Sequence, residues 1–268
     1  MFFADYHSHT SFSSDCNTPM ENMIQRGIAL GLTQLVFTDH VDFDYPNLDF
    51  TFEINYDEYL EVFQKYQKKY QDDITLLLGV EVGFQPQLVQ KIEDFTSKYP
   101  FDFIIGSSHV VDCLDLYNGD FFKGKEQKEA YYRYFESILD NIRVFDCFQV
   151  YGHLDYIIRY GDYPNPVLSY QEYQEIIDGI LKALVHKGKG LELNTSGYRY
   201  GLGQFHPQSS ILKAYKRFGG EMITVGSDAH RTQDLCADFK TAYELLKEVG
   251  FSYFTVFKNQ KPEFVPIP

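Results

Sequence analysis

Residues that can bind a metal ion follow most of the short apolar runs of this 268-residue sequence. The first are His7 and His9, which come shortly after the apolar residues 2–4. Side chains two residues apart point to the same side of a strand, so these two imidazoles can bind one ion. Imidazole suits Zn, Fe, Ni and Cu. Asp5, just before them, could accept a hydrogen bond from an imidazole and orient it.

The same pattern recurs along the chain. Asp228 and His230 repeat the two-residue spacing after the apolar run 222–225. Glu81 follows the run 76–80, where a carboxylate is costly unless it is paired or bound to metal. Its two oxygens could bridge two ions. Three more histidines follow apolar runs: His40, His109 and His153.

Six of the eight histidines therefore lie just past expected strand ends. The C-terminal ends of parallel strands converge on one mouth, which brings distant ligands together. Of the other two, His186 lies in an expected helix and is interpreted as structural. His206 lies in an expected mouth loop before Pro207, where it could contact a substrate.

Short apolar runs alternate with longer amphipathic segments about seven times, which predicts parallel strands with right-handed crossovers. The expected strands are residues 2–4, 35–37, 74–80, 101–105, 147–151, 191–193 and 222–225. The expected helices are residues 20–30, 56–70, 86–98, 126–143, 169–186, 208–218 and 236–249. Ligands on nearly every strand favour a barrel over a doubly wound sheet, which concentrates its site at one switch point. Residues 253–257 are expected as an edge strand or a tail that closes the barrel.

Composition limits the classes of protein that fit. The sequence has 24 Lys and Arg against 38 Asp and Glu, a formal charge of −14, which argues against broad binding to nucleic acid. Four cysteines without a C-x-x-C pair indicate reduced thiols. Neither a signal-peptide pattern nor a membrane-spanning run is found. We expect one domain over residues 1–268, cytoplasmic, with no nucleic-acid or membrane partner and an oligomeric state that the sequence leaves open.

Taken together, the motifs resemble the polymerase-and-histidinol-phosphatase (PHP) family, in that family's order. They are Asp5-Tyr6-His7-Ser8-His9, Thr38-Asp39-His40, Glu81, Ser107-Ser108-His109, Gly152-His153 and Gly226-Ser227-Asp228-Ala229-His230. The length and the segment 192–197 resemble the monofunctional histidinol-phosphate phosphatases. The resemblance implies an α/β fold, a distorted (β/α)7 barrel in a single domain, with its metal site at the C-terminal ends of the strands.

The resemblance also implies a cofactor of three divalent transition-metal ions, which would be Zn, Fe or Mn. By position in the motifs, the first ion would be held by His7, His9, Glu81 and Asp228, the second by Glu81, His109 and His153, and the third by Asp15, His40 and His230. Family members often have His where this chain has Asp15. A harder carboxylate ligand would shift that site toward Mn or Fe, or weaken it.

The activity implied by the resemblance is hydrolysis of L-histidinol phosphate to L-histidinol and phosphate, a step of histidine biosynthesis. A metal-activated hydroxide would attack the phosphorus, and the residues expected to take part in catalysis are Glu81, Asp228 and His230. The partner is then a small phosphomonoester.

Two arginines are candidates for binding the substrate phosphate. Arg159 and Arg199 lie in expected mouth loops, and a guanidinium fork matches phosphate geometry. With His206 they complete the predicted substrate residues. Four alternatives stay open: a PHP-type phosphodiesterase or nuclease, another phosphomonoesterase, an amidohydrolase-type enzyme that acts on C–N bonds, and a non-catalytic metal-binding module.

Overall fold

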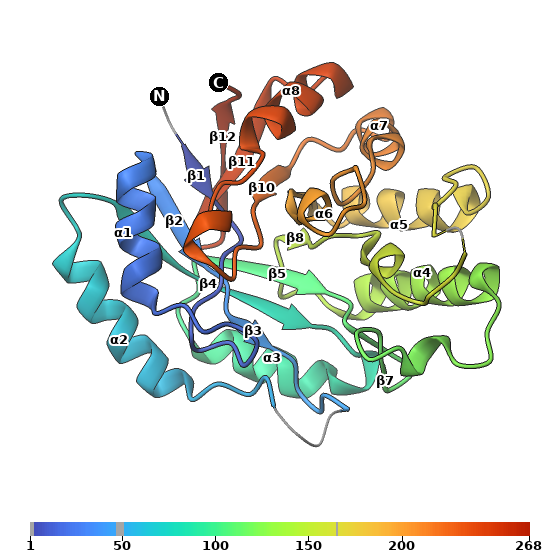
Figure 1. The fold of residues 1–268 in the computed structure, drawn as a ribbon, viewed down its shortest axis with the longest axis horizontal. Helices are drawn as coiled ribbons and strands as arrows, with labels where there is room; N and C mark the ends of the chain where they lie inside the picture. The colour runs from blue at the N-terminus through green and yellow to red at the C-terminus, as the bar shows by residue number, and fades with distance from the viewer. Residues whose placement is uncertain (1–2, 47–50, 165) are drawn as a thin grey trace.

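The computed structural model describes residues 3–46, 51–164 and 166–268, so Phe2 of the expected first strand lies outside the described residues. Within these ranges, seven parallel strands form a nearly closed barrel in the order β1-β2-β4-β5-β8-β9-β10 (Figure 1). Their bounds are β1 (Ala4–Asp5), β2 (Gln34–Phe37), β4 (Thr75–Gly83), β5 (Phe103–Ser107), β8 (Val150–Tyr151), β9 (Gly190–Asn194) and β10 (Ile223–Gly226). The predicted barrel is confirmed.

Backbone hydrogen bonds join the first strand of the barrel to the last. Tyr6 N donates to Val225 O at 3.1 Å, and His9 N donates to Ala229 O at 2.9 Å. Asp228 N donates to the carbonyl oxygen of His7 at 2.8 Å. The segments that carry the two histidine motifs, at opposite ends of the sequence, therefore lie side by side.

Strand β4 is longer than the sequence indicates. It continues to Gly83, so Glu81 lies inside the strand and not beyond its end. A short extra strand, β3 (His40–Val41), pairs with this second half of β4 and places His40 opposite Glu81. The extension follows from this pairing, which continues the hydrogen-bond ladder where β2 ends.

Helices surround the barrel (Figure 1). They are α1 (Met20–Leu30), α2 (Tyr56–Lys69), α3 (Val89–Lys98), α4 (Gln127–Val144), α5 (Gln174–His186), α6 (Ser196–Arg199), α7 (Ser209–Arg217) and α8 (Phe239–Val249), with 3₁₀ turns η1 (Pro86–Leu88), η2 (Asp120–Phe122), η3 (Tyr156–Arg159) and η4 (Thr232–Asp234). Helix α4 buries Tyr131, Phe135, Ile138 and Ile142, a spacing that puts one apolar face on the barrel. Among the described residues, no helix is long and apolar enough to cross a membrane.

The helix boundaries differ from the expected ones mainly at their starts. Helix α5 begins at Gln174 and not at residue 169, because turns occupy the intervening residues. Pro19 is the N-cap of α1. The hydroxyl of the preceding Thr18 donates to His230 O at 2.8 Å, and Cys16 Sγ donates to the same oxygen at 3.1 Å. The loop before α1 is thereby attached to the last histidine motif.

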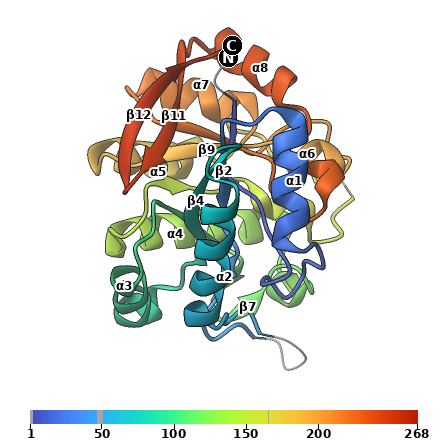
Figure 2. The same ribbon diagram turned by 90° about the vertical axis from the view of Figure 1, so that its left-hand side faces the viewer.

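The C-terminal segment forms a separate antiparallel hairpin, β11 (Tyr253–Lys258) and β12 (Lys261–Pro266) (Figure 2). It covers the barrel at the first residues of the strands, the end away from the histidines. Ile223 N donates to Thr255 Oγ1 at 3.0 Å, and the rings of Phe103 and Phe257 stack at 5.2 Å. The segment 253–257 is thus not an edge strand of the barrel, because its partner is β12.

We predict that Tyr6 holds this hairpin in place. Its hydroxyl accepts from Phe257 N at 2.8 Å and contacts Gln34 Oε1 and Phe257 O, both at 2.9 Å. Tyr6→Phe should lower the free energy of unfolding by about 1–3 kcal/mol, because a buried N–H loses its acceptor. Urea denaturation measures the change. Tyr253→Phe is the control, because Tyr253 lies on the same hairpin and is 49% exposed. Equal losses of unfolding free energy in the two variants would contradict the role assigned to Tyr6.

Candidate metal centre

The fully buried Glu81 side chain lies among five imidazoles, of which His9 is the farthest, with its Nε2 3.5 Å from Glu81 Oε2. Its Oε2 is 3.0 Å from His7 Nε2 and 3.1 Å from His40 Nδ1. Its Oε1 is 2.8 Å from His153 Nε2 and 3.3 Å from His109 Nε2. One carboxylate on β4 thus contacts side chains that come from, or directly follow, β1, β3, β5 and β8.

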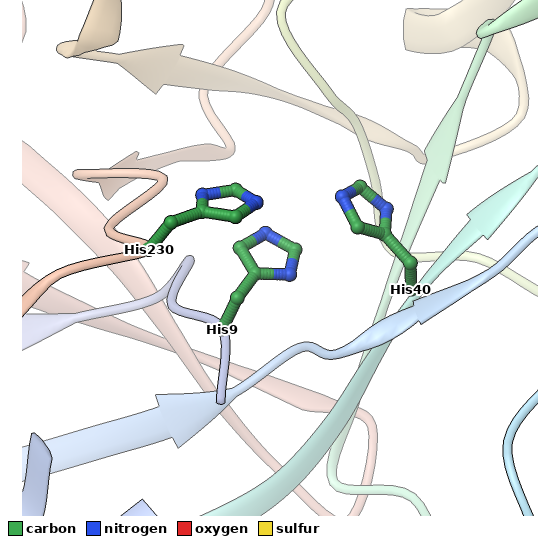
Figure 3. A group of neighbouring side chains, drawn as sticks. All are labelled: His9, His40 and His230. Atoms are coloured by element: carbon green, nitrogen blue, oxygen red, sulfur yellow. The ribbon is translucent and has the colours of Figure 1, made fainter. Parts of the chain in front are cut away.

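A second group of rings lies toward the mouth, where His9 lies between His230 and His40 (Figure 3). The ring centroids are 4.1 Å apart for His9 and His230, and 4.3 Å apart for His9 and His40. Asp15 Oδ2 is 3.2 Å from His230 Nε2 and 3.6 Å from His40 Nε2. Asp15, which differs from the His common in the family, therefore lies beside His40 and His230 as expected from the sequence.

Asp228 completes the cluster from the β10 side. Its Oδ1 lies 3.5 Å from His9 Nε2 and 3.8 Å from His7 Nε2. Its backbone has φ 54°, a left-handed conformation that L residues seldom adopt and that occurs often at functional sites. All nine residues predicted as metal ligands are therefore brought together.

The donor set fits transition-metal ions. Four overlapping groups have ligand atoms within 4.8 Å of one another: His7, His9 and Glu81; Glu81, His109 and His153; His9, His40 and His230; and His40, Asp42 and His109. His7 Nε2 and His9 Nε2 are only 3.0 Å apart. A cation bound by both nitrogens would relieve the repulsion between their lone pairs. Imidazole and carboxylate together suit Zn, Fe and Mn.

Two carboxylates that the sequence reasoning missed orient these imidazoles. His7 Nδ1 donates to Glu192 Oε1 at 2.5 Å, and His109 Nδ1 donates to Asp42 Oδ2 at 2.7 Å. Such contacts fix the tautomer of a metal-binding histidine. The signals were weak but present, since Glu192 is an acid inside an apolar run and Asp42 repeats the two-residue spacing after His40.

The charges of the cluster act strongly on one another. Burial alone would raise the pKa of Glu81, but His7, His40 and His109 hold it well below its usual range. Burial alone would lower the pKa of His7, yet Glu192 and Glu81 raise it well above the ordinary value. Without metal, the cluster therefore keeps protons on some imidazoles to balance its carboxylates.

Seven of the nine predicted metal ligands, all except His7 and His9, line a cavity of about 900 Å³, and Arg159 and Arg199 line it too. The Arg159 guanidinium lies over the rings of Tyr156 and Tyr200, at 4.6 and 4.2 Å from their centroids. It contacts Asp228 Oδ2 at 3.5 Å. These contacts hold the positively charged guanidinium beside the cluster, where it could bind a phosphate.

One guanidinium nitrogen of Arg199 is hydrogen-bonded to the backbone, and another is available for a ligand. Its Nη2 donates to the carbonyl oxygens of Ser227 and Asp228, at 2.9 and 2.8 Å. Its Nη1 is buried and has no hydrogen-bond partner among the residues that the structure describes. Arg199 therefore supports the loop that carries Asp228 and keeps one nitrogen for another acceptor.

His206 does not lie in the cavity wall, contrary to what the sequence suggests. It is fully buried, its Nδ1 donates to Asp155 Oδ1 at 2.5 Å, and its Nε2 accepts from Arg159 Nε at 3.1 Å. Both ring nitrogens are therefore occupied within the protein. The structure gives His206 a positioning role behind Arg159 in place of a direct substrate contact, and it adds Asp155, which the sequence reasoning missed.

Comparisons with known proteins agree with this geometry. The family model of the PHP domain matches residues 5–196. The chain is 34% identical over 259 residues to histidinol-phosphatase from Lactococcus lactis subsp. lactis, which covers 96% of this chain and 95% of that protein. The chain belongs to the PHP domain family.

Further relatives cover the same length. A probable histidinol-phosphatase from Clostridium acetobutylicum is 32% identical over 245 residues, 90% of this chain and 91% of that protein. Among solved PHP structures, histidinol phosphate phosphatase from Lactococcus lactis, complexed with zinc, L-histidinol and phosphate, is similar with a TM-score of 0.90 and 32% identity. That match covers 97% of this chain and 98% of the other.

We predict that this PHP centre releases protons when it binds metal. Burial would lower the pKa of His230, but its hydrogen bond with Asp15 raises it to about 9, so His230 is protonated at pH 7 without metal. An ion that binds there must displace the proton. Metal affinity should therefore rise with pH up to about pH 9.

Calorimetric titration of chelator-treated protein with zinc, in buffers of different ionisation enthalpy, measures the released protons. The exposed His186 provides the control: His186→Asn should leave the pH dependence unchanged, whereas His230→Asn should reduce it. Equal zinc affinity at pH 6.5 and pH 8.5 would show that His230 does not bind the ion.

We also predict that His206 strengthens phosphate binding only by holding the Arg159 side chain in position. His206→Leu removes the acceptor for Arg159 Nε and should weaken the binding of inorganic phosphate to the metal-loaded protein by about tenfold, as for a lost hydrogen bond to a charged group. His206→Gln can bond to both neighbours and should retain most affinity. Isothermal titration measures both, and equal losses in the two variants would contradict the positioning role.

Proposed function

We propose that this protein is a metal-dependent histidinol-phosphate phosphatase, which hydrolyses L-histidinol phosphate to L-histidinol and phosphate in histidine biosynthesis. The observation that carries the proposal is the cluster of nine convergent candidate ligands, Glu81 and eight others, beside a cavity that Arg159 and Arg199 also line. Similarity to a structure with zinc, L-histidinol and phosphate supports the same substrate for this chain.

For the metal we propose three ions and the ligand sets expected from the motifs. The close groups support these sets: His7, His9 and Glu81, with Asp228 nearby; Glu81, His109 and His153; and His40 and His230, which are grouped with His9 and have Asp15 nearby. Zinc is supported by the Lactococcus lactis structure, and manganese or iron at the Asp15 position is supported by the harder carboxylate donor.

When bound, such ions supply charge that stabilises the phosphate and lowers the pKa of a bound water. The residues of the chain prepare the site for this. Glu192 holds the proton of His7 on Nδ1 and Asp42 holds that of His109 on Nδ1, so both Nε2 lone pairs face the centre. Glu81, Asp228 and His230 remain the predicted catalytic residues.

The phosphate is bound, in this proposal, by the two arginines. Arg159 presents its guanidinium from between two aromatic rings, and Arg199 has its Nη1 free. Monoester hydrolysis without a catalyst is among the slowest known reactions, so the site must supply about 20 kcal/mol or more. Several charges at the phosphate are needed for that, which explains two arginines beside the metal cluster. A cytoplasmic location remains a prediction.

The test is phosphate release from L-histidinol phosphate by protein supplied separately with Zn, Mn and Fe, compared with other phosphomonoesters and a single-stranded oligonucleotide. We expect selective hydrolysis of L-histidinol phosphate. Glu81→Ala should lose most metal and lower kcat/KM by at least about a hundredfold, since several charges act together. The exposed Glu244→Ala is the control. Activity in metal-free protein, or preferential cleavage of the oligonucleotide, would reject the proposal.

A further inference from the structure

A small hairpin directly after His109 forms part of the cavity wall. Its strands are β6 (Val110–Val111) and β7 (Leu114–Asp115), joined by two residues with positive φ, as in a tight two-residue turn. Asp115 pairs with Val110, and Leu116 N donates to His109 O at 3.2 Å. Asp115 is therefore held close to the backbone of a metal-binding residue, and it lines the cavity.

Asp115 differs from the other carboxylates that line the cavity, which are Asp15, Asp42, Glu81, Asp228 and Asp234. Asp15, Asp42, Glu81 and Asp228 contact imidazoles of the cluster. Asp234 Oδ2 lies 3.9 Å from Arg199 Nε. Within the described parts of the chain, Asp115 alone among these six takes part in no ion pair with Lys, Arg or His.

The surroundings of Asp115 provide neutral hydrogen-bond donors but no positive charge. Its side chain is 1% exposed, its Oδ1 accepts from Tyr117 N at 2.7 Å, and within the described residues its Oδ2 has no hydrogen-bond partner. Burial and a hydrogen bond with the Asp115 carboxylate raise the pKa of Tyr45, so the Tyr45 hydroxyl stays protonated and brings no positive charge. A buried carboxylate without a cation is costly, so a cationic ligand group would be strongly favoured there.

We propose that Asp115 binds the ammonium group of the substrate and so selects amine-bearing phosphomonoesters. The inference rests on the proposed function, because L-histidinol phosphate carries a primary amine. In this proposal the phosphate lies at the arginines and the metal cluster, and Asp115 lines the same cavity, within reach of the rest of the substrate.

Aromatic side chains around Asp115 suit the remaining part of such a substrate. Tyr117 is 68% exposed and lines the cavity, with its ring 6.0 Å from that of Tyr160. Aromatic faces attract cations and accept flat apolar rings. The hairpin thus offers a carboxylate for the amine next to an aromatic surface for a planar ring.

The test compares L-histidinol phosphate with 3-(imidazol-4-yl)propyl phosphate, which lacks the amine, on the metal-loaded protein. Asp115→Asn should raise KM for L-histidinol phosphate by about tenfold or more, because a buried ion pair is lost. It should change kcat/KM for the amine-free ester by less than about twofold, with metal content unchanged. The selectivity for the amine should largely disappear.

Asp112→Asn is the matched control on the same hairpin. Asp112 pairs with Arg133 on the outer surface and has φ 55°, which Asn tolerates, so both substrates should behave as in the unaltered protein. Equal losses with both esters in Asp115→Asn would assign a purely structural role and overturn the inference. Unchanged KM for L-histidinol phosphate would also overturn it.

Failure of the proposed function is distinguishable from failure of this inference. If the unaltered protein does not hydrolyse L-histidinol phosphate, the proposed function is rejected. The amine site is then tested with 2-aminoethyl phosphate against ethyl phosphate. A preference for the amine that Asp115→Asn removes supports the inference, and its absence overturns it.

Discussion

The Glu81 carboxylate is buried among five imidazoles, which lie 2.8 to 3.5 Å from its two oxygens, and the arrangement of the barrel serves this burial. A buried charge is tolerated only when its partners are close and well oriented. Those partners come from different strands, so the barrel must close before the charge is compensated. The same convergence that satisfies Glu81 creates a set of donors suited to metal ions.

Around Glu81, contacts with neighbouring side chains fix the orientation of the other residues of the site. All the predicted metal ligands except Asp15 lie on strands or within a few residues of their ends, and buried carboxylates such as Glu192 and Asp42 hold imidazoles in one tautomer. Arg159 is fixed in a similar way, by two aromatic rings on its faces and by His206 at its Nε. The hairpin that carries Asp115 begins directly after His109, and a hydrogen bond from Leu116 N to His109 O joins it to the predicted metal centre.

Much of the fold could be predicted from sequence because parallel strands that are buried on both faces are apolar runs, and helices between them carry one apolar face. Helix α1 occurs as expected, and the barrel strands differ from prediction mainly at their ends. The errors lie where tertiary pairing decides. Strand β4 extends past Glu81 because β3 pairs with it, and the C-terminal segment forms its own hairpin because β12 supplies its partner.

Residue type and position after each apolar run are local properties, so the amino-acid sequence alone indicates which residues converge. His7, His9 and the other expected ligands follow from that pattern. What each side chain faces depends on the folded barrel. It turned His206 toward Asp155 and Arg159 and left Asp115 without a cation. Glu192 and His7 are 185 positions apart, and such partners meet only when the closed barrel sets the direction of each side chain.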